Sequence, residues 1–177
     1  MIIVNASTRG SCRKIFTENY LAASLSTPAD ITEVLMTTVQ QILDAKGHDV
    51  YSVRPEDTVL HALQLMEAKN VGAVLIKDGD RLVGIFTERH YARNVFLRGR
   101  SSPKTLVREV MEKHVVFVEP YQTAEYCMAL MTEKRIRHLP VIREGRLEGV
   151  ISIGDLMKSM IADREFNIDQ LVRYVSG

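Results

Sequence analysis

The sequence repeats itself after 65 residues, and this repeat limits the fold more than any other feature does. Shifted by that distance, residues 50–91 align with residues 115–156 without a gap. Ten positions are identical, and in the first copy they are Val50, Val53, Pro55, Thr58, Leu65, Met66, Lys69, Arg81, Leu82 and Gly84. A unit of this size buries its own apolar faces poorly. The repeat therefore predicts two copies of one unit, packed about a pseudo-twofold axis with clefts between them.

The second copy shows most clearly what each unit contains. Leu139–Arg143 and Arg146–Ile151 are apolar, β-prone runs joined by a turn at Glu144-Gly145. Ser152 and Asp155 follow, in the S-x-x-D spacing that is typical of a helix N-terminus. With the strand and helix before it, the unit has the order β-α-β-β-α.

The first copy predicts the same order. Thr58 caps a helix that ends at Lys69-Asn70. The turn of the following hairpin is Asp78-Gly79. The predicted strands of the first copy are Val50–Val53, before the helix, and Gly72–Ile76 and Arg81–Phe86, which form the hairpin.

These paired units resemble a known family. The segments VYSVRPEDTV…LVGIFTER and VVFVEPYQTA…RHLPVIREGRLEGVISIGDL are similar to a stand-alone, bacterial-type tandem pair of CBS domains, a Bateman module. The resemblance covers about residues 31–161 and implies an α/β (α+β) fold of two β-α-β-β-α repeats about a pseudo-twofold axis. It also implies a regulatory module that binds an adenosine ligand, such as AMP, ADP, ATP, NAD(H) or S-adenosylmethionine.

We predict four segments. Residues 1–30 are a flexible tail, 31–100 the first CBS domain, 101–163 the second, and 164–177 a C-terminal helix or tail. Ile31–Ala45 has the apolar face of an amphipathic helix that ends at Gly47, and Phe166–Tyr174 is a second candidate helix. The basic N-terminus is interpreted as a tail rather than a transit peptide, which favours the cytoplasm over the mitochondrial matrix.

The second copy carries the residue types that adenosine recognition needs. Asp155 is a candidate acceptor for the ribose hydroxyls, and Ser152 and Gly154 lie in the turn that would donate to phosphate. Arg137 and His138 are candidates for neutralising that phosphate. The resemblance places the segment from Lys46 to Val50 over the base. The alternative is that Ser152 and Asp155 only cap a helix.

The first copy departs from this pattern. His90 stands where Asp155 stands in the second copy, and a neutral imidazole accepts only one hydrogen bond. Gly72 and Ala73 replace Arg137 and His138, whereas Thr87 and Arg89 remain as candidate phosphate ligands. Three outcomes stay open: weaker adenosine binding, a different ligand, or an empty site. A separate alternative is that His90 contacts a ligand phosphate.

Other functions find no support in the sequence. The five histidines have no metal-ligand spacing, and no nucleophile or phosphate-loop motif is present, so we predict no metal site, no catalytic residue and no enzyme. A net charge of +1 and the lack of an 18-residue apolar run argue against nucleic acid and membrane as partners. The expected partners are a second copy in a homodimer and an unknown regulated protein. The alternative function is a constitutive dimerisation module with a vestigial cleft.

Overall fold

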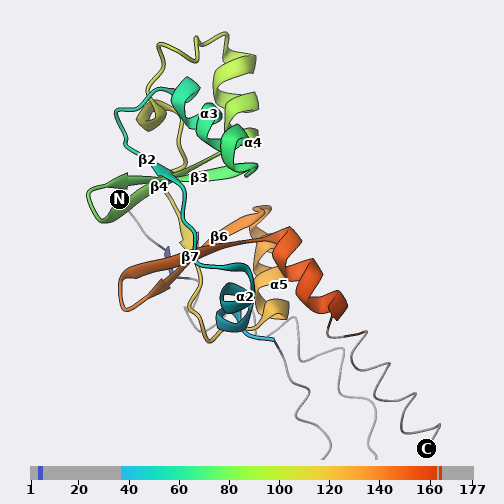
Figure 1. Ribbon diagram of the computed structural model, residues 1–177. Coiled ribbons are helices and arrows are strands. Elements are labelled where there is room, and N and C mark those ends of the chain that lie inside the picture. The colour runs from blue at the N-terminus through green and yellow to red at the C-terminus, as the bar shows by residue number, and fades with distance from the viewer. Residues whose placement is uncertain (1–3, 6–36, 163, 165–177) are drawn as a thin grey trace, which may run out of the picture.

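The computed structural model describes residues 4–5, 37–162 and 164, and shows two α+β units stacked end to end (Figure 1). The labelled elements are Val4–Asn5 (β1), Val39–Lys46 (α2), Ser52–Val53 (β2), Val59–Lys69 (α3), Ala73–Asp78 (β3), Arg81–Thr87 (β4), Glu88–His90 (α4), Val116–Phe117 (β5), Ala124–Lys134 (α5), His138–Arg143 (β6) and Arg146–Ser152 (β7). The described chain also contains a π-helical turn at Tyr91–Val95 and 3-10 turns at Phe96–Arg98 and Val107–Glu109. A further helix covers residues 153–162.

The two copies have the same strand pairing. β2 pairs in parallel with β3, and β3 pairs antiparallel with β4 in one sheet. In the second copy, β6 and β7 pair in the same antiparallel way, and a parallel bridge joins Val118 to Val141. Each hairpin shifts register at the same repeat position, after Ile76 and after Val141. The α+β fold and the repeat predicted from the sequence are confirmed.

The main helix of the first copy begins and ends as the sequence predicts, and that of the second copy has caps at the equivalent positions. Thr58 Oγ1 accepts from the His61 backbone N–H at 3.2 Å, and Thr123 caps α5 in the same way. α3 ends at Asn70 and α5 at Arg135, which have positive φ angles of 50° and 54°. These ends are predictable because capping depends on residues adjacent in the chain.

The helix predicted for Ile31–Ala45 differs at its start. α2 begins at Val39, because Thr38 is extended and forms a capping box with Gln41. Its end at Gly47 agrees with the prediction, and the φ of 97° there explains the glycine. Residues 31–36 lie outside the described part of the chain, as do the candidate helix Phe166–Tyr174 and most of the predicted tail. Within that tail, β1 pairs in parallel with β5.

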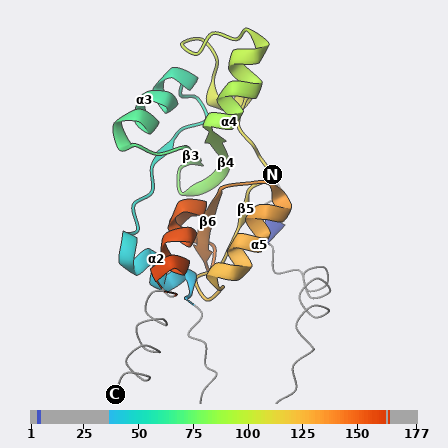
Figure 2. The same cartoon turned by 90° about the vertical axis from the view of Figure 1, so that its right-hand side faces the viewer.

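α2 packs on the second copy, although it precedes the first copy in the sequence. Figures 1 and 2 show it in the lower unit with α5, β6 and β7. Its apolar residues Val39, Ile42 and Leu43 join a buried cluster with Cys127, Met131, Leu139, Val141, Ile151 and Leu156. The segment that connects the two copies packs in the equivalent way on the first copy. Its residues Val107 and Val110 lie in the core of that copy. Each unit is thus completed by the segment that precedes the other unit.

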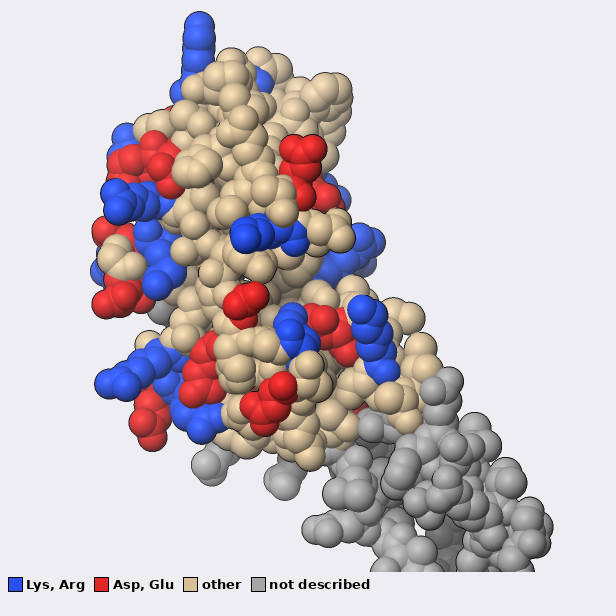
Figure 3. Space-filling model, in the orientation of Figure 1, with Lys and Arg blue, Asp and Glu red and all other residues tan. Residues whose placement is uncertain are grey.

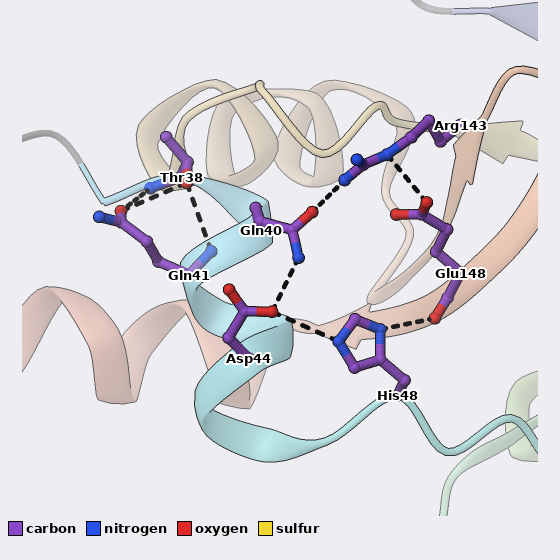
Figure 4. Close-up of polar contacts among 7 residues, drawn as sticks. All are labelled: Thr38, Gln40, Gln41, Asp44, His48, Arg143 and Glu148. Carbon is purple, nitrogen blue, oxygen red and sulfur yellow. Dashed lines mark hydrogen bonds and ion pairs between the residues drawn. The ribbon is translucent and has the colours of Figure 1, made fainter.

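Polar contacts also fix α2 to the β6–β7 hairpin (Figure 4). Gln40 Nε2 donates to Asp44 Oδ1 at 2.8 Å, and His48 Nδ1 lies 3.0 Å from the Glu148 carbonyl oxygen. Arg143 on β6 contacts Gln40 and forms an ion pair with Glu148 at 2.8 Å. These groups lie at the surface, partly or fully exposed, so they define the position of α2 more than they add stability.

A repeated glycine gives each preceding segment room to pack. A Cβ atom on Gly149 would lie 2.7 Å from Leu43 Cδ2. One on Gly84, the equivalent residue, would lie 2.6 Å from Met111 Sδ and 3.0 Å from the Glu112 carbonyl oxygen. The identity of these two glycines in the repeat therefore reflects close packing in both units.

The two units meet through a third apolar cluster. It contains Leu82 and Ile85 of the first copy with Val115 of the second. Their repeat equivalents Leu147, Val150 and Val50 also pack against it. Residues at equivalent positions on both sides of one interface are what a pseudo-twofold axis produces.

Candidate functional site

One cavity lies between the units and is lined by both; we call it the second-copy cavity because it contains Asp155. Its volume is about 370 Å³, within the range of about 300–1,000 Å³ that is usual for ligand pockets. The polar lining consists of Lys46, Asp49, Lys69, Asn70, His138, Ser152 and Asp155. The apolar lining consists of Tyr51, Val71, Ala73, Leu75 and Val150. The cavity therefore offers an apolar wall and a charged end.

Asp155 is held in place by three donors on one oxygen. Its Oδ2 accepts from Lys46 Nζ at 2.7 Å, from the Ser152 backbone N–H at 2.7 Å and from Ser152 Oγ at 2.8 Å. Lys46 Nζ also donates to the Val150 carbonyl oxygen at 2.9 Å. No described residue donates to Asp155 Oδ1. This second oxygen is therefore available to accept from a ligand.

The charges in this cavity differ from those expected. Burial by itself raises the pKa of the Asp155 carboxyl, but hydrogen bonds from Lys46 and Ser152 outweigh it and lower that pKa below its usual value. Burial lowers the pKa of His138 below its usual value; the Asp155 charge acts in the opposite direction, but the charges of Lys46 and Arg137 add to the lowering. Near neutral pH, Asp155 is thus ionised and His138 is uncharged. The positive charge expected from His138 comes instead from Lys46.

A smaller cavity, which we call the first-copy cavity, has a volume of about 250 Å³. It contains the predicted residues Thr87, Arg89 and His90. It also contains Arg137, which was predicted from the sequence to lie in the other cleft. Arg137 lies in a bend just before β6, and it lines this cavity but not the second-copy cavity. His138 and Gly72 line both cavities.

His90 lines the first-copy cavity and is half-buried. Its backbone N–H donates to Thr87 Oγ1 at 3.3 Å, and its ring centroid lies 6.4 Å from that of Phe86. Burial lowers the pKa of His90 below its usual value. Its Nδ1 atom is buried and has no hydrogen-bond partner among the described residues. The imidazole is therefore uncharged near neutral pH, with one polar atom unsatisfied.

Of the other predicted residues, Lys46, Ser152 and His138 lie beside Asp155, whereas Val50 packs in the interface between the units. Gly154 is exposed, next to the Ser152 side chain. Sequence reasoning missed Tyr51, whose ring lies 5.4 Å from Lys69 Nζ and forms part of the apolar wall. No motif marks Tyr51, since its equivalent in the repeat is Val116.

The CBS domain model matches residues 31–96 and 107–162 of the chain. The chain belongs to the CBS-domain family. The mitochondrial CBS domain-containing protein CBSX3 of Arabidopsis thaliana is 35% identical over 150 residues, covering 80% of this chain and 73% of that protein.

Two solved CBS structures extend the comparison. A protein with CBS domains from Burkholderia ambifaria is 55% identical, with a TM-score of 0.70 over 72% of this chain and 96% of that one. The hexameric CBS-CP12 protein from bloom-forming cyanobacteria is 30% identical, with a TM-score of 0.63 over 70% of this chain and 67% of that one. Stand-alone CBS proteins of this kind are regulatory rather than catalytic.

Other features of the CBS pair bear on its chemistry. Cys127 is buried, and burial raises the pKa of its thiol to about 12, so it is not a reactive thiolate. Within the described ranges, no group of His, Cys, Asp and Glu side chains is arranged to hold a metal ion. No helix in the same ranges is long and apolar enough to cross a membrane. The face in Figure 3 has acidic and basic side chains interspersed, rather than one broad basic surface.

Proposed function

We propose that this CBS pair is a regulatory module that binds an adenosine nucleotide in the second-copy cavity. CBS pairs are regulatory, and they often bind adenosine ligands. The observation that carries the proposal is the Asp155 carboxylate, ionised and oriented by Ser152, with one oxygen open beside the Lys46 ammonium group. AMP, ADP, ATP, NAD(H) and S-adenosylmethionine all contain the ribose that such a carboxylate recognises.

The lining residues suggest a role for each part of the ligand. Asp155 accepts from the ribose hydroxyls, and Lys46 moves toward the phosphate, which pairs with its charge in place of the carboxylate. The adenine base fits the wall formed by Tyr51, Val71 and Leu75. Ser152 acts by orienting Asp155, because its hydroxyl already donates to that carboxylate. This assignment replaces the phosphate donor role that the sequence predicted for Ser152.

Regulation follows from where the cavity lies. Tyr51 and Leu75 belong to the first copy, whereas His138 and Asp155 belong to the second. A ligand that contacts both copies binds one relative arrangement of the units better than another, and so shifts the population toward it. A regulated protein that contacts both units would sense adenylate or dinucleotide levels through this shift.

Self-association is the second part of the proposal. The hexameric CBS-CP12 relative shows that proteins with this fold assemble. Phe96 and Ile161, at equivalent repeat positions, are 69% and 53% exposed, so each unit offers an apolar residue for contact with a second copy. We propose a homodimer, and sedimentation equilibrium at micromolar concentration tests it: a monomer there would rule it out.

Nucleotide binding is tested by thermal unfolding of the full chain with AMP, ADP, ATP, NAD(H), S-adenosylmethionine or adenosine. A ligand at 100 times its Kd is expected to stabilise the fold by about 2.7 kcal/mol. Guanosine and cytidine nucleotides are the matched controls, since they share the ribose and phosphate but not the base. If no adenine compound raises the melting temperature at millimolar concentration, the alternative of a constitutive dimerisation module is favoured.

A further inference from the structure

Four arginine side chains converge on the first-copy cavity. Arg89 and Arg93 come from the first copy, and Arg135 and Arg137 come from the second. Two glutamates also line it, so the four arginines leave an excess of two positive charges. Of these glutamates, Glu112 accepts from the His114 backbone N–H at 2.8 Å and pairs with the His114 ring at 3.3 Å. In the described ranges, none of the four arginines forms an ion pair with a carboxylate.

The backbone at Arg135 contributes to this arrangement. Arg135 ends α5 with a φ of 54°, where the first copy has Asn70 with a φ of 50°. Asparagine tolerates this left-handed conformation, whereas arginine is seldom found in it. In this conformation, the Arg135 carbonyl oxygen accepts from Arg89 Nη1 at 2.6 Å. The Arg135 backbone thus holds the Arg89 guanidinium group at the cavity.

The same cavity lacks the aspartate that the second-copy cavity has at the equivalent repeat position. His90 occupies the repeat position of Asp155, and its buried Nδ1 has no described partner. Guanidinium groups bind phosphate oxygens in pairs through their planar N–H donors. The volume of about 250 Å³ is also smaller than that of the second-copy cavity, at about 370 Å³. The lining therefore matches several linked phosphate groups better than it matches a nucleoside.

We propose that the first-copy cavity is an oligophosphate site, in which Arg89, Arg93, Arg135 and Arg137 bind a chain of two or three phosphates. That chain belongs either to a free inorganic oligophosphate or to a nucleotide triphosphate that enters from the second-copy cavity. The second source is considered because the two cavities are adjacent, with Gly72 and His138 lining both. The proposal does not depend on adenosine binding, since an inorganic anion has no base or ribose.

The test is calorimetric titration of inorganic tripolyphosphate into the full-length protein and its variants. Arg135→Gln and Arg137→Gln remove one guanidinium each and leave the Arg89 contact with the backbone in place. Each loss is expected to weaken tripolyphosphate binding about tenfold or more, as for a charge-assisted hydrogen bond. Arg146→Gln, on an exposed strand end outside the cavity, is the matched control and should bind as the wild type does. Thermal melts without ligand show whether each variant is folded.

Two further titrations identify the source of the phosphate chain. If it belongs to a nucleotide, tripolyphosphate competes with ATP, and Arg137→Gln weakens ATP more than AMP. If it is a separate anion, one tripolyphosphate binds per chain when AMP already saturates the protein. Either result supports the site. The proposal is wrong if the wild type does not bind tripolyphosphate at millimolar concentration, or if Arg146→Gln weakens it as much as Arg137→Gln does.

Discussion

Replacing Leu43 with alanine is expected to lower the free energy of unfolding by about 2–5 kcal/mol, the usual cost of a buried leucine truncated to alanine. Leu43 is fully buried in the core of the second copy, and it is one of three residues through which α2 fills that core. Urea unfolding at equilibrium measures the change. Leu60→Ala is the matched control, because Leu60 is 38% exposed on α3 and should lose much less. If Leu43→Ala is as stable as Leu60→Ala, α2 does not pack where the structure has it.

Substitution of Gly149 tests the same packing of Leu43 on the second copy more directly. Gly149→Ala places a Cβ atom 2.7 Å from Leu43 Cδ2 in a packed core, and overpacking of this kind costs about 1–3 kcal/mol. In the Leu43→Ala background that methyl group has room, so the same substitution should be nearly neutral. A double-mutant cycle measures the difference as a coupling energy. Strictly additive effects would show that the two residues are not in contact.

Asp155→Asn is expected to weaken AMP binding by about 1.5–3 kcal/mol, or roughly 10–150-fold. The substitution keeps the shape of the side chain and an oxygen for the Ser152 cap, but it removes the charge and one of the two acceptor oxygens. Calorimetry measures the affinity, and a thermal melt without ligand reports the fold separately. An Asp155→Asn variant that binds AMP as tightly as the wild type would remove Asp155 from the proposed site.

Substitution of Lys46 distinguishes the contribution of the ribose from that of the phosphate to the binding energy of AMP. Its ammonium group is paired with Asp155 at 2.7 Å in the structure without ligand. In Lys46→Met the carboxylate is released, so adenosine should bind at least as well as to the wild type. AMP should bind less well, because its phosphate loses the charge that replaces the carboxylate as partner. Lys77→Met, outside both cavities and paired with Asp80, is the matched control. Equal changes for AMP and adenosine would contradict the role given to Lys46.

The sequence by itself determined the repeated unit and most of its local structure. The 65-residue repeat predicted two equivalent α+β units, and Thr58 and Gly47 marked helix ends that the structure confirms. Such features depend on residues a few positions apart, so they can be read in one pass along the chain. The S-x-x-D spacing also placed Ser152 and Asp155 correctly relative to each other.

Only the tertiary structure decided which residues share a cavity. Lys46 and Asp155 are 109 positions apart, and they meet because α2 crosses to the second copy, a packing that its amphipathic pattern does not encode. Arg137 was assigned to one cleft and lies in the other with Arg89 of the first copy, because the packing of the two units decides which cavity a residue at their junction lines. An apolar stripe predicts that a helix will be buried but leaves the partner open. The partner is fixed where the shapes fit, as Leu43 fits over Gly149.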